Sequence, residues 1–498
     1  MTTSVAKAGK GALSYKWLAL ITVYIGTIMG TMDAGILNIS YPILTEVLHT
    51  DPSTVVWVTL IYMLIGSGLM LTLGRIGDVW GRKRIYTLGF IIFSIGLALC
   101  SVAQNIAQLI LFRVVQAVGS AMVVSNGTAI ITDAFPSTER GKALGILSTG
   151  VSVGFISGPI LGGLFLDLID WRAIFYLRLP VGFIGTAMAW WILREHRTSN
   201  IRPRFDLLGA FFLFGFFASL LLGVNQGVRL GWTSAPIIGL GVSFLAFFVL
   251  FLITELRVDQ PVVDLKLFRH RMFSSANTSL MLVFLAVSAN TFLLPFYLEE
   301  GLGYSASHTG MILITNAAVA MIIAPISGAI SDKVGYWLLC TFGMVGTCSG
   351  LFLLSRLTTE STTTDVILRL LLMGIGSGMF QSPNNSAIMG SVPRNRLGTA
   401  SAMIATVRQM GMSIGLAIAA MVFTSREAFH AAQLASQGLS QDVLKSQALV
   451  GGYHDALIVS VLLASIGIFT SLVRGQVIAS EGPKAAQVEV SPSGGEDS

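Results

Sequence analysis

The segment GRIGDVWGRKR, residues 74–84, decides the fold because it is a short charged turn enclosed between two long apolar runs. One run covers about residues 54–75, and the other covers about residues 85–104. An α-helix needs about 20 apolar residues to cross the hydrocarbon core of a bilayer. The segment therefore predicts a chain that crosses a membrane, turns in water and crosses back.

The composition predicts the same environment for the whole chain. Of the 498 residues, 53% are hydrophobic and 11% are charged, whereas about a quarter of the residues of a soluble domain are charged. The apolar runs are continuous rather than alternating, which favours helices over a barrel. We therefore expect an all-α integral membrane protein, and the composition excludes a soluble enzyme. The three cysteines lie inside apolar runs, so no disulfide and no metal site is expected.

Fourteen runs are long enough to span the membrane. The first follows Lys7, Lys10 and Lys16, a charge pattern like that of a signal peptide, but its length and the missing cleavage site indicate an uncleaved span. The predicted spans cover residues 17–40, 54–75, 85–104, 107–132, 142–166, 172–193, 206–224, 236–256, 273–298, 308–331, 336–356, 366–390, 398–424 and 453–474. A polar outer loop that can be helical in part is expected over residues 425–452.

The basic residues predict the orientation. With the N-terminus inside, the inner segments hold 22 of the 31 lysines and arginines, and the outer loops hold four. Positive charge on one side predicts that both termini are cytoplasmic, which requires an even number of spans. Because the basic residues are divided among short loops, the net charge of +6 does not indicate nucleic-acid binding.

An internal repeat divides the chain. The segment 74–81 aligns with the segment 328–335, and further glycine and proline positions align at nearly the same offset. Repeats of this kind are typical of transporters with a substrate site between the halves. The prediction is a tail at 1–16, a six-helix bundle at 17–193, a two-helix insert with linkers at 194–272, a second six-helix bundle at 273–475 and a disordered tail at 476–498.

The segment 74–84 resembles the signature between the second and third spans of the major facilitator superfamily. The resemblance implies a cytoplasmic latch in which Asp78 faces the positive end of the helix that begins near Gly398. The alternative is that Asp78 caps its own helix and the bases only set the topology. The implied cytoplasmic gate comprises Gly74, Arg75, Gly77, Asp78, Gly81, Arg82 and Lys83.

The fifth span has glycines at every fourth position, which permits close helix packing. Its pattern also resembles the signature of antiporters within the superfamily, and this favours efflux over uptake. Ordinary helix packing would explain the spacing as well. The residues that carry the pattern are Gly150, Gly154, Gly158, Pro159 and Gly162.

Asp33 lies inside the first span, where an ionised carboxylate is costly unless it faces the bundle interior. The segment 33–42 resembles the first-span signature of the fourteen-helix drug:proton antiporter branch, and the segment 113–119 resembles its fourth-span signature. The resemblance implies that Asp33 and Arg113 take part in proton coupling, although both residues fit purely structural roles. Two positions depart from the pattern. Gly35 stands where threonine is usual, and Arg178, expected near the outer mouth, stands where asparagine is usual.

Polar residues within the spans are candidates for an adaptable substrate cavity. Most of them are expected to bond between helices, and a minority to touch the ligand. The candidates are Asn38, Gln116, Asn126, Asn290, Gln381, Asn384 and Arg408.

The expected function is proton-coupled export of lipophilic or cationic drugs, or of other small molecules, across the cell membrane. The partners are then protons, the solute and the lipid bilayer, and the protein is expected to be a monomer that binds no nucleic acid. No GxxxxGK[ST] loop is present, so the proton motive force rather than ATP or a cofactor is the expected energy source. The alternatives are a dedicated exporter of one metabolite, such as an antibiotic, siderophore or amino acid, and a non-transporting sensor. A membrane enzyme is disfavoured, because no catalytic constellation is present.

Overall fold

The computed structural model describes residues 14–136, 139–195, 207–258, 265–392, 397–437 and 440–472, and within these ranges the chain forms helices and their connections. Fourteen helical segments of this described part are long and apolar enough to cross a membrane. The helices of the first part are α1 (Tyr15–Val47), α2 (Pro52–Val55), α3 (Trp57–Trp80), α4 (Arg82–Ser101), α5 (Ile106–Ala134), α6 (Arg140–Leu168), α7 (Ala173–Tyr176) and α8 (Leu179–Ile192).

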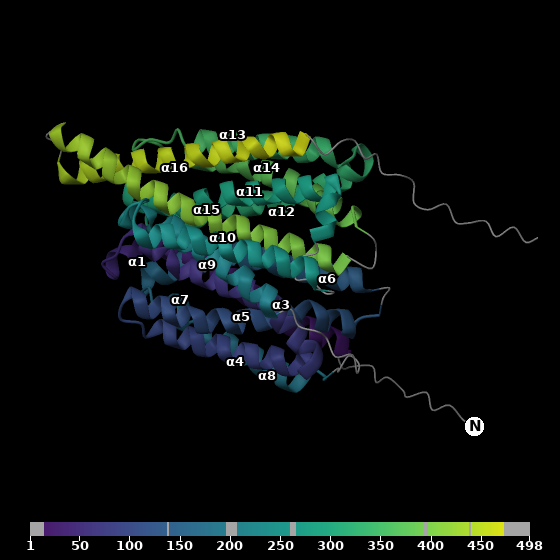
Figure 1. Cartoon of the computed structure of the whole chain (residues 1–498). Helices are drawn as coiled ribbons and strands as arrows, with labels where there is room; N and C mark the ends of the chain where they lie inside the picture. The colour runs from purple at the N-terminus through teal and green to yellow at the C-terminus, as the bar shows by residue number, and fades with distance from the viewer. Residues whose placement is uncertain are drawn as a thin grey trace, which may run out of the picture.

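The remaining helices complete the fourteen spans. They are α9 (Leu207–Leu230), α10 (Ala235–Arg257), η1 (Leu265–Arg269), α11 (Arg271–Phe296), η2 (Tyr297–Gly301), α12 (Ala306–Val334), α13 (Tyr336–Leu354), α14 (Thr363–Gly390), α15 (Leu397–Leu434), η4 (Ala435–Gln437) and α16 (Gln441–Leu472). The start of α1 and the end of α16 lie at the same end of the bundle (Figure 1).

The end of the last two spans differs from the prediction. Most of the segment expected as an outer loop is helical, because α15 continues to Leu434 and α16 already begins at Gln441. A hydropathy window ends a span at the first polar run, whereas hydrogen bonding continues the helix into water. The two helices therefore extend past the other spans at one end of the molecule (Figure 1).

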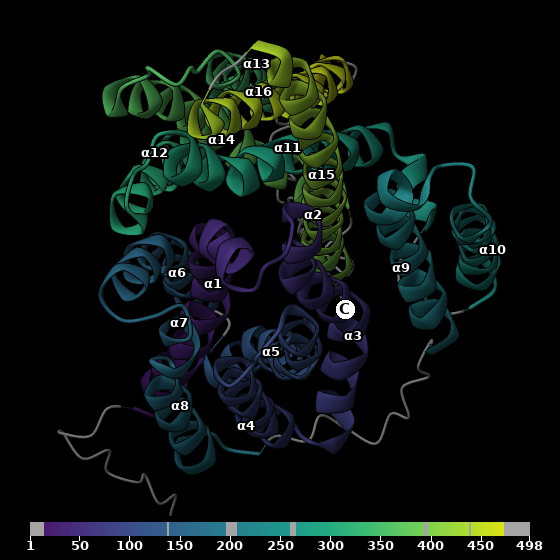
Figure 2. The same cartoon turned by 90° about the vertical axis from the view of Figure 1, so that its left-hand side faces the viewer.

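The helices form two groups that face each other, with α1 and α3–α8 in one group and α11–α16 in the other (Figure 2). The pair α9 and α10 lies beside them, with α9 against α3 and α15 and α10 at the outer edge (Figure 2). One polar link fixes α9: the Trp57 indole donates to Asn225 Oδ1 at 2.6 Å, and Asn225 Nδ2 donates to the carbonyl of Ser53 at 2.8 Å. The exact division of the chain into the segments given above stays a prediction.

The repeat has a structural reason. Gly81 ends α3 with φ of 109°, and Gly335 ends α12 with φ of 86°. Side chains other than glycine are strained in this region of backbone space. The two glycines therefore allow the same sharp turn into the next helix in both halves.

The equivalent helix pairs also pack alike. Gly119 of α5 lies against the backbone of α4 at Phe93, and Gly376 of α14 lies against the backbone of α13 at Thr347. A Cβ atom at either glycine would overlap the facing backbone nitrogen. Close contact between these helices therefore requires a residue without a side chain, as in membrane helix pairs generally.

Candidate functional site

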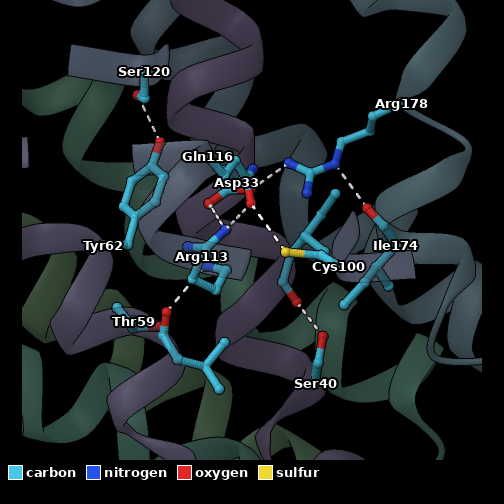
Figure 3. A network of polar contacts seen from close by, with 12 residues as sticks. Asp33, Ser40, Thr59, Tyr62, Cys100, Arg113, Gln116, Ser120, Ile174 and Arg178 are labelled. Atoms are coloured by element: carbon cyan, nitrogen blue, oxygen red, sulfur yellow. Dashed lines mark hydrogen bonds and ion pairs between the residues drawn. The ribbon is translucent and has the colours of Figure 1, made fainter. Parts of the chain in front are cut away.

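A buried ion cluster lies inside the first group of helices, centred on Asp33 of α1 (Figure 3). The side chain of Asp33 is 0% exposed. Arg113 Nη1 lies 2.8 Å from Asp33 Oδ2, and Gln116 Nε2 donates to Asp33 Oδ1 at 2.8 Å. The structure thus brings together three residues that the sequence singled out separately.

Spacing along α5 explains part of this geometry. Arg113 and Gln116 are three residues apart, so they share one helix face, and Arg113 Nη1 donates to Gln116 Oε1 at 2.6 Å. Arg113 Nε donates to the carbonyl of Val58 at 3.0 Å, and its guanidinium carbon lies 4.2 Å from the centre of the Tyr62 ring. The α3 helix thereby holds the guanidinium in place against the acid.

Arg178, which was expected to add a cation near the outer mouth, is the cluster's fourth member. The residue is 2% exposed, and its Nη1 donates to Asp33 Oδ1 at 2.6 Å. Its Nε donates to the carbonyl of Ile174 at 2.7 Å. The tight turn between α7 and α8 directs the side chain inward, which hydropathy could not reveal. The sequence signal was the departure from the family pattern at this position.

The cluster carries unequal charge. Two guanidinium groups face one carboxylate, so its formal charge is +1. Arg178 Nη2 is buried, and no hydrogen-bond partner for it is found among the described residues. A buried charge is tolerated when it is paired and hydrogen-bonded, and removing one partner leaves the other uncompensated. The arrangement therefore depends on Asp33 more than on either arginine.

The glycines of α6 form its contact surface with α1. At Gly158 the backbones approach so closely that a Cβ atom would lie 2.9 Å from the Cα of Gly35. Gly154 faces the α1 backbone at Ile28, and Gly162 faces it at Ile36. Gly35, the departure from the family pattern on α1, is thus part of the same close contact. These glycines place α1 directly against α6.

The two groups of helices touch at the end away from the termini. There Tyr41 of α1 packs against Phe292 and Phe296 of α11, with ring centres 5.0 and 6.5 Å apart. Asp167 at the end of α6 accepts hydrogen bonds from the backbone N–H groups of Ala306 and Ser307 in α12. The sequence reading did not single out Asp167. This end is closed by contacts between the groups.

The predicted cytoplasmic gate is only partly visible. The side chains of Arg75 and Asp78 lie outside the described residues, so the latch between Asp78 and the start of α15 stays a prediction. Arg82 forms an ion pair with Asp133 of α5 at 2.5 Å. Gly77 makes room for the amide of Asn126, because a Cβ atom there would overlap that side chain.

The cavity candidates have different surroundings. Asn126 donates to the carbonyls of Met122 and Leu73, so it ties α5 to α3. Asn290 and Asn384 are buried, and neither amide atom of Asn384 has a partner among the described residues. Arg408 of α15 lies with its guanidinium carbon 5.9 Å from the Phe284 ring centre. The half-buried candidates are Asn38, Gln381 and Arg408.

Comparisons with known proteins agree on one family. Residues 23–416 match the model described as Major Facilitator Superfamily. The chain is 34% identical over 413 residues to the riboflavin transporter RibZ of Clostridioides difficile, covering 82% of this chain and 89% of the relative. It is 30% identical over 409 residues to the multidrug resistance protein Stp of Mycobacterium tuberculosis, covering 82% of this chain and 76% of the relative.

The fold has a solved counterpart. A bacterial homologue of the human lysosomal transporter Spinster, in an inward-facing and unoccupied conformation, superposes with a TM-score of 0.66. The similarity covers 93% of this chain and 98% of that one, at 18% sequence identity. At this identity the similarity concerns the fold alone.

Proposed function

The chain belongs to the major facilitator superfamily, and we propose that it is a proton-coupled antiporter that exports small organic molecules by alternating access. It is a multi-pass membrane transporter and not an enzyme. We place it in the cytoplasmic membrane with both termini inside, since most lysines and arginines fall on that side of the predicted topology.

One observation carries the proposal: a fully buried carboxylate, Asp33, is ion-paired within a membrane span. Ionisable groups at membrane depth are expensive and mark ion pathways and proton relays. Asp33 also lies on α1, the helix that contacts α6 within its own half and α11 in the other half. A change in the charge of Asp33 therefore acts on a helix that is in contact with both halves.

The contacts that close the outer end indicate in which state of the cycle Asp33 loses its proton. In the proposed topology the contacts of Tyr41 and Asp167 close the outer side, so we assign this structure to the part of the cycle in which Asp33 is shut off from the outside. In this state Asp33 lies between two guanidinium groups, and these ion pairs require the carboxylate form. A proton taken up outside is thus released on the inside. Protonation would take place in the opposite state, after α1 has separated from α11.

The test uses purified protein in proteoliposomes with an imposed pH gradient and a panel of dyes and drugs. Asp33→Asn keeps the shape of the side chain and removes its charge, so gradient-driven transport should stop while facilitated exchange without a gradient persists. Asp442→Asn, an exposed acid in the first turn of α16, is the matched control and should transport normally. Coupled transport by the Asp33→Asn protein at the wild-type rate would remove Asp33 from the mechanism.

A second candidate is a transporter dedicated to one metabolite. The observation that favours it is the 34% identity to a protein named as a riboflavin transporter. The same vesicles distinguish the two candidates when riboflavin is added to the panel. Saturable movement of riboflavin alone supports the dedicated transporter, whereas competition among unrelated dyes supports the broad exporter.

A further inference from the structure

The contact of Asp167 with α12 joins the two halves through charge and hydrogen bonding. Asp167 Oδ1 accepts from the N–H of Ala306 at 3.1 Å, and Oδ2 accepts from the N–H of Ser307 at 2.9 Å. Ala306 and Ser307 are the first two residues of α12, which follows the N-cap residue Ser305. The first N–H groups of a helix have no partner within the helix. The helix end also carries partial positive charge, which attracts a carboxylate.

The backbones around this contact fit closely. A Cβ atom at Gly163 of α6 would lie 2.5 Å from the carbonyl oxygen of Ala306, and one at Gly310 of α12 would overlap the carbonyl oxygen of Pro159. The two helices therefore approach each other closely through glycine in the turns that lead up to the Asp167 contact. Asp167 itself is exposed to water, so its hydrogen bonds can break and reform without stranding a buried charge.

The predicted cytoplasmic latch would be the counterpart of this contact at the other end of the molecule. The predicted cytoplasmic latch places Asp78, at the end of α3, against the start of α15. In the order of spans, α3 is second in the first half and α15 is fifth in the second half. For Asp167 the two span numbers are exchanged. Asp167 lies at the end of the fifth span of the first half and contacts the start of the second span of the second half.

We propose that Asp167 is the outer latch of the transport cycle, holding the outer end closed while the latch at Asp78 is released. Each carboxylate belongs to the first half, and each helix N-terminus belongs to the second half. A rocking motion that separates one carboxylate from its helix brings the other carboxylate toward its helix. The inference rests on the proposed alternating-access function and adds the residue that stabilises one of the two states.

The test measures the distance across the outer end by electron paramagnetic resonance. The full-length protein carries spin labels at Leu168→Cys and Thr359→Cys, which are exposed positions beside the latch and in the outer loop between α13 and α14. Cys100, Cys340 and Cys348 are replaced by alanine. An anion at an exposed helix N-terminus corresponds to roughly a two- to fivefold change in a two-state ratio. Asp167→Ala should lower the ratio of closed to open outer ends by about this factor.

Two further variants make the result specific. Asp170→Ala removes an exposed acid three residues later. Within the described part of the chain its carboxylate accepts hydrogen bonds from its neighbours Trp171 and Arg172, so the substitution should leave the distances unchanged. Ala306→Pro removes one N–H donor at the first helical position, where proline is well tolerated. It should produce a smaller shift in the same direction as Asp167→Ala.

The outcomes separate the two proposals. Unchanged distances in Asp167→Ala, or an equal shift in Asp170→Ala, would overturn the latch. The distances are recorded without solute or gradient, so they do not depend on the transport assay. A protein that shows the Asp167 shift but moves no solute would contradict the proposed function and leave the latch supported.

Discussion

The second helix pair of each half offers a direct comparison, since α4 and α5 correspond to α13 and α14. Gly119 and Gly376 occupy equivalent positions and press against the facing backbone in the same way. The equivalents of Arg113 and Gln116, however, are Leu370 and Met373, which are 1% and 0% exposed. The helices meet alike in the two halves, whereas at these two positions the charged and amide side chains occur in the first half only.

This difference shows which residues the packing of the helices requires and which it does not. Close helix contact depends on backbone shape, so any copy of the pair needs the glycines. A buried charge has no such structural necessity, because apolar side chains fill the same positions in the second half. The ion cluster around Asp33 is therefore best explained by function, and we expect the two halves to respond differently to equivalent changes.

The largest effect is expected when the acid of the cluster is removed. Asp33→Ala leaves Arg113 and Arg178 buried without an anion, which should lower the free energy of unfolding by about 3–5 kcal/mol. The measurement is thermal unfolding of the detergent-purified protein. The control, Asp442→Ala, removes an exposed acid and should leave the midpoint in place. Equal stability of the two variants would mean that the cluster does not hold the first half together.

A smaller effect, equal in both halves, is expected at the paired glycines. Gly119→Ala and Gly376→Ala each insert a methyl group into close backbone contact, and each should cost about 1–3 kcal/mol of stability. Thermal unfolding under one set of conditions compares the two variants. If only one of them were destabilised, the conclusion that the helix pairs pack alike would fail.

Patterns within short segments of the sequence predicted the spans. The contacts that were not predicted join residues that lie far apart in the sequence. The fourteen spans and the turn glycines Gly81 and Gly335 could be predicted, because apolar runs and positive-φ turns are properties of short segments. The partners of Arg178 and Asp167 could not, since each bond joins residues more than 130 positions apart. Asp33, Arg113 and Gln116 were singled out as polar residues within spans and through the family resemblance, which together gave the residues but not their distances.

A still smaller effect is expected for Arg178→Asn, although the substitution also removes a charge from the cluster. Asp33 keeps Arg113 and Gln116 as partners, and the remaining ion pair is balanced. The stability should therefore change by about 1 kcal/mol, much less than in Asp33→Ala. The double variant Asp33→Asn with Arg178→Asn should be more stable than Asp33→Asn alone, because it buries one uncompensated cation instead of two. No such recovery in thermal unfolding would show that Arg178 does not share the charge of Asp33.

The smallest effect on stability is expected for Asn384→Leu in the second half. Asn384 is 0% exposed and neither of its amide atoms has a partner among the described residues, so an apolar side chain of similar size should shift the stability by less than about 1 kcal/mol. Asn126→Leu is the matched change in the first half and should cost more, because Asn126 donates to the carbonyls of Met122 and Leu73. An amide that adds nothing to stability needs another reason to be buried. If a stably folded Asn384→Leu protein lost transport, that reason would be contact of Asn384 with the solute. Unaltered transport would instead show that Asn384 does not line the substrate cavity.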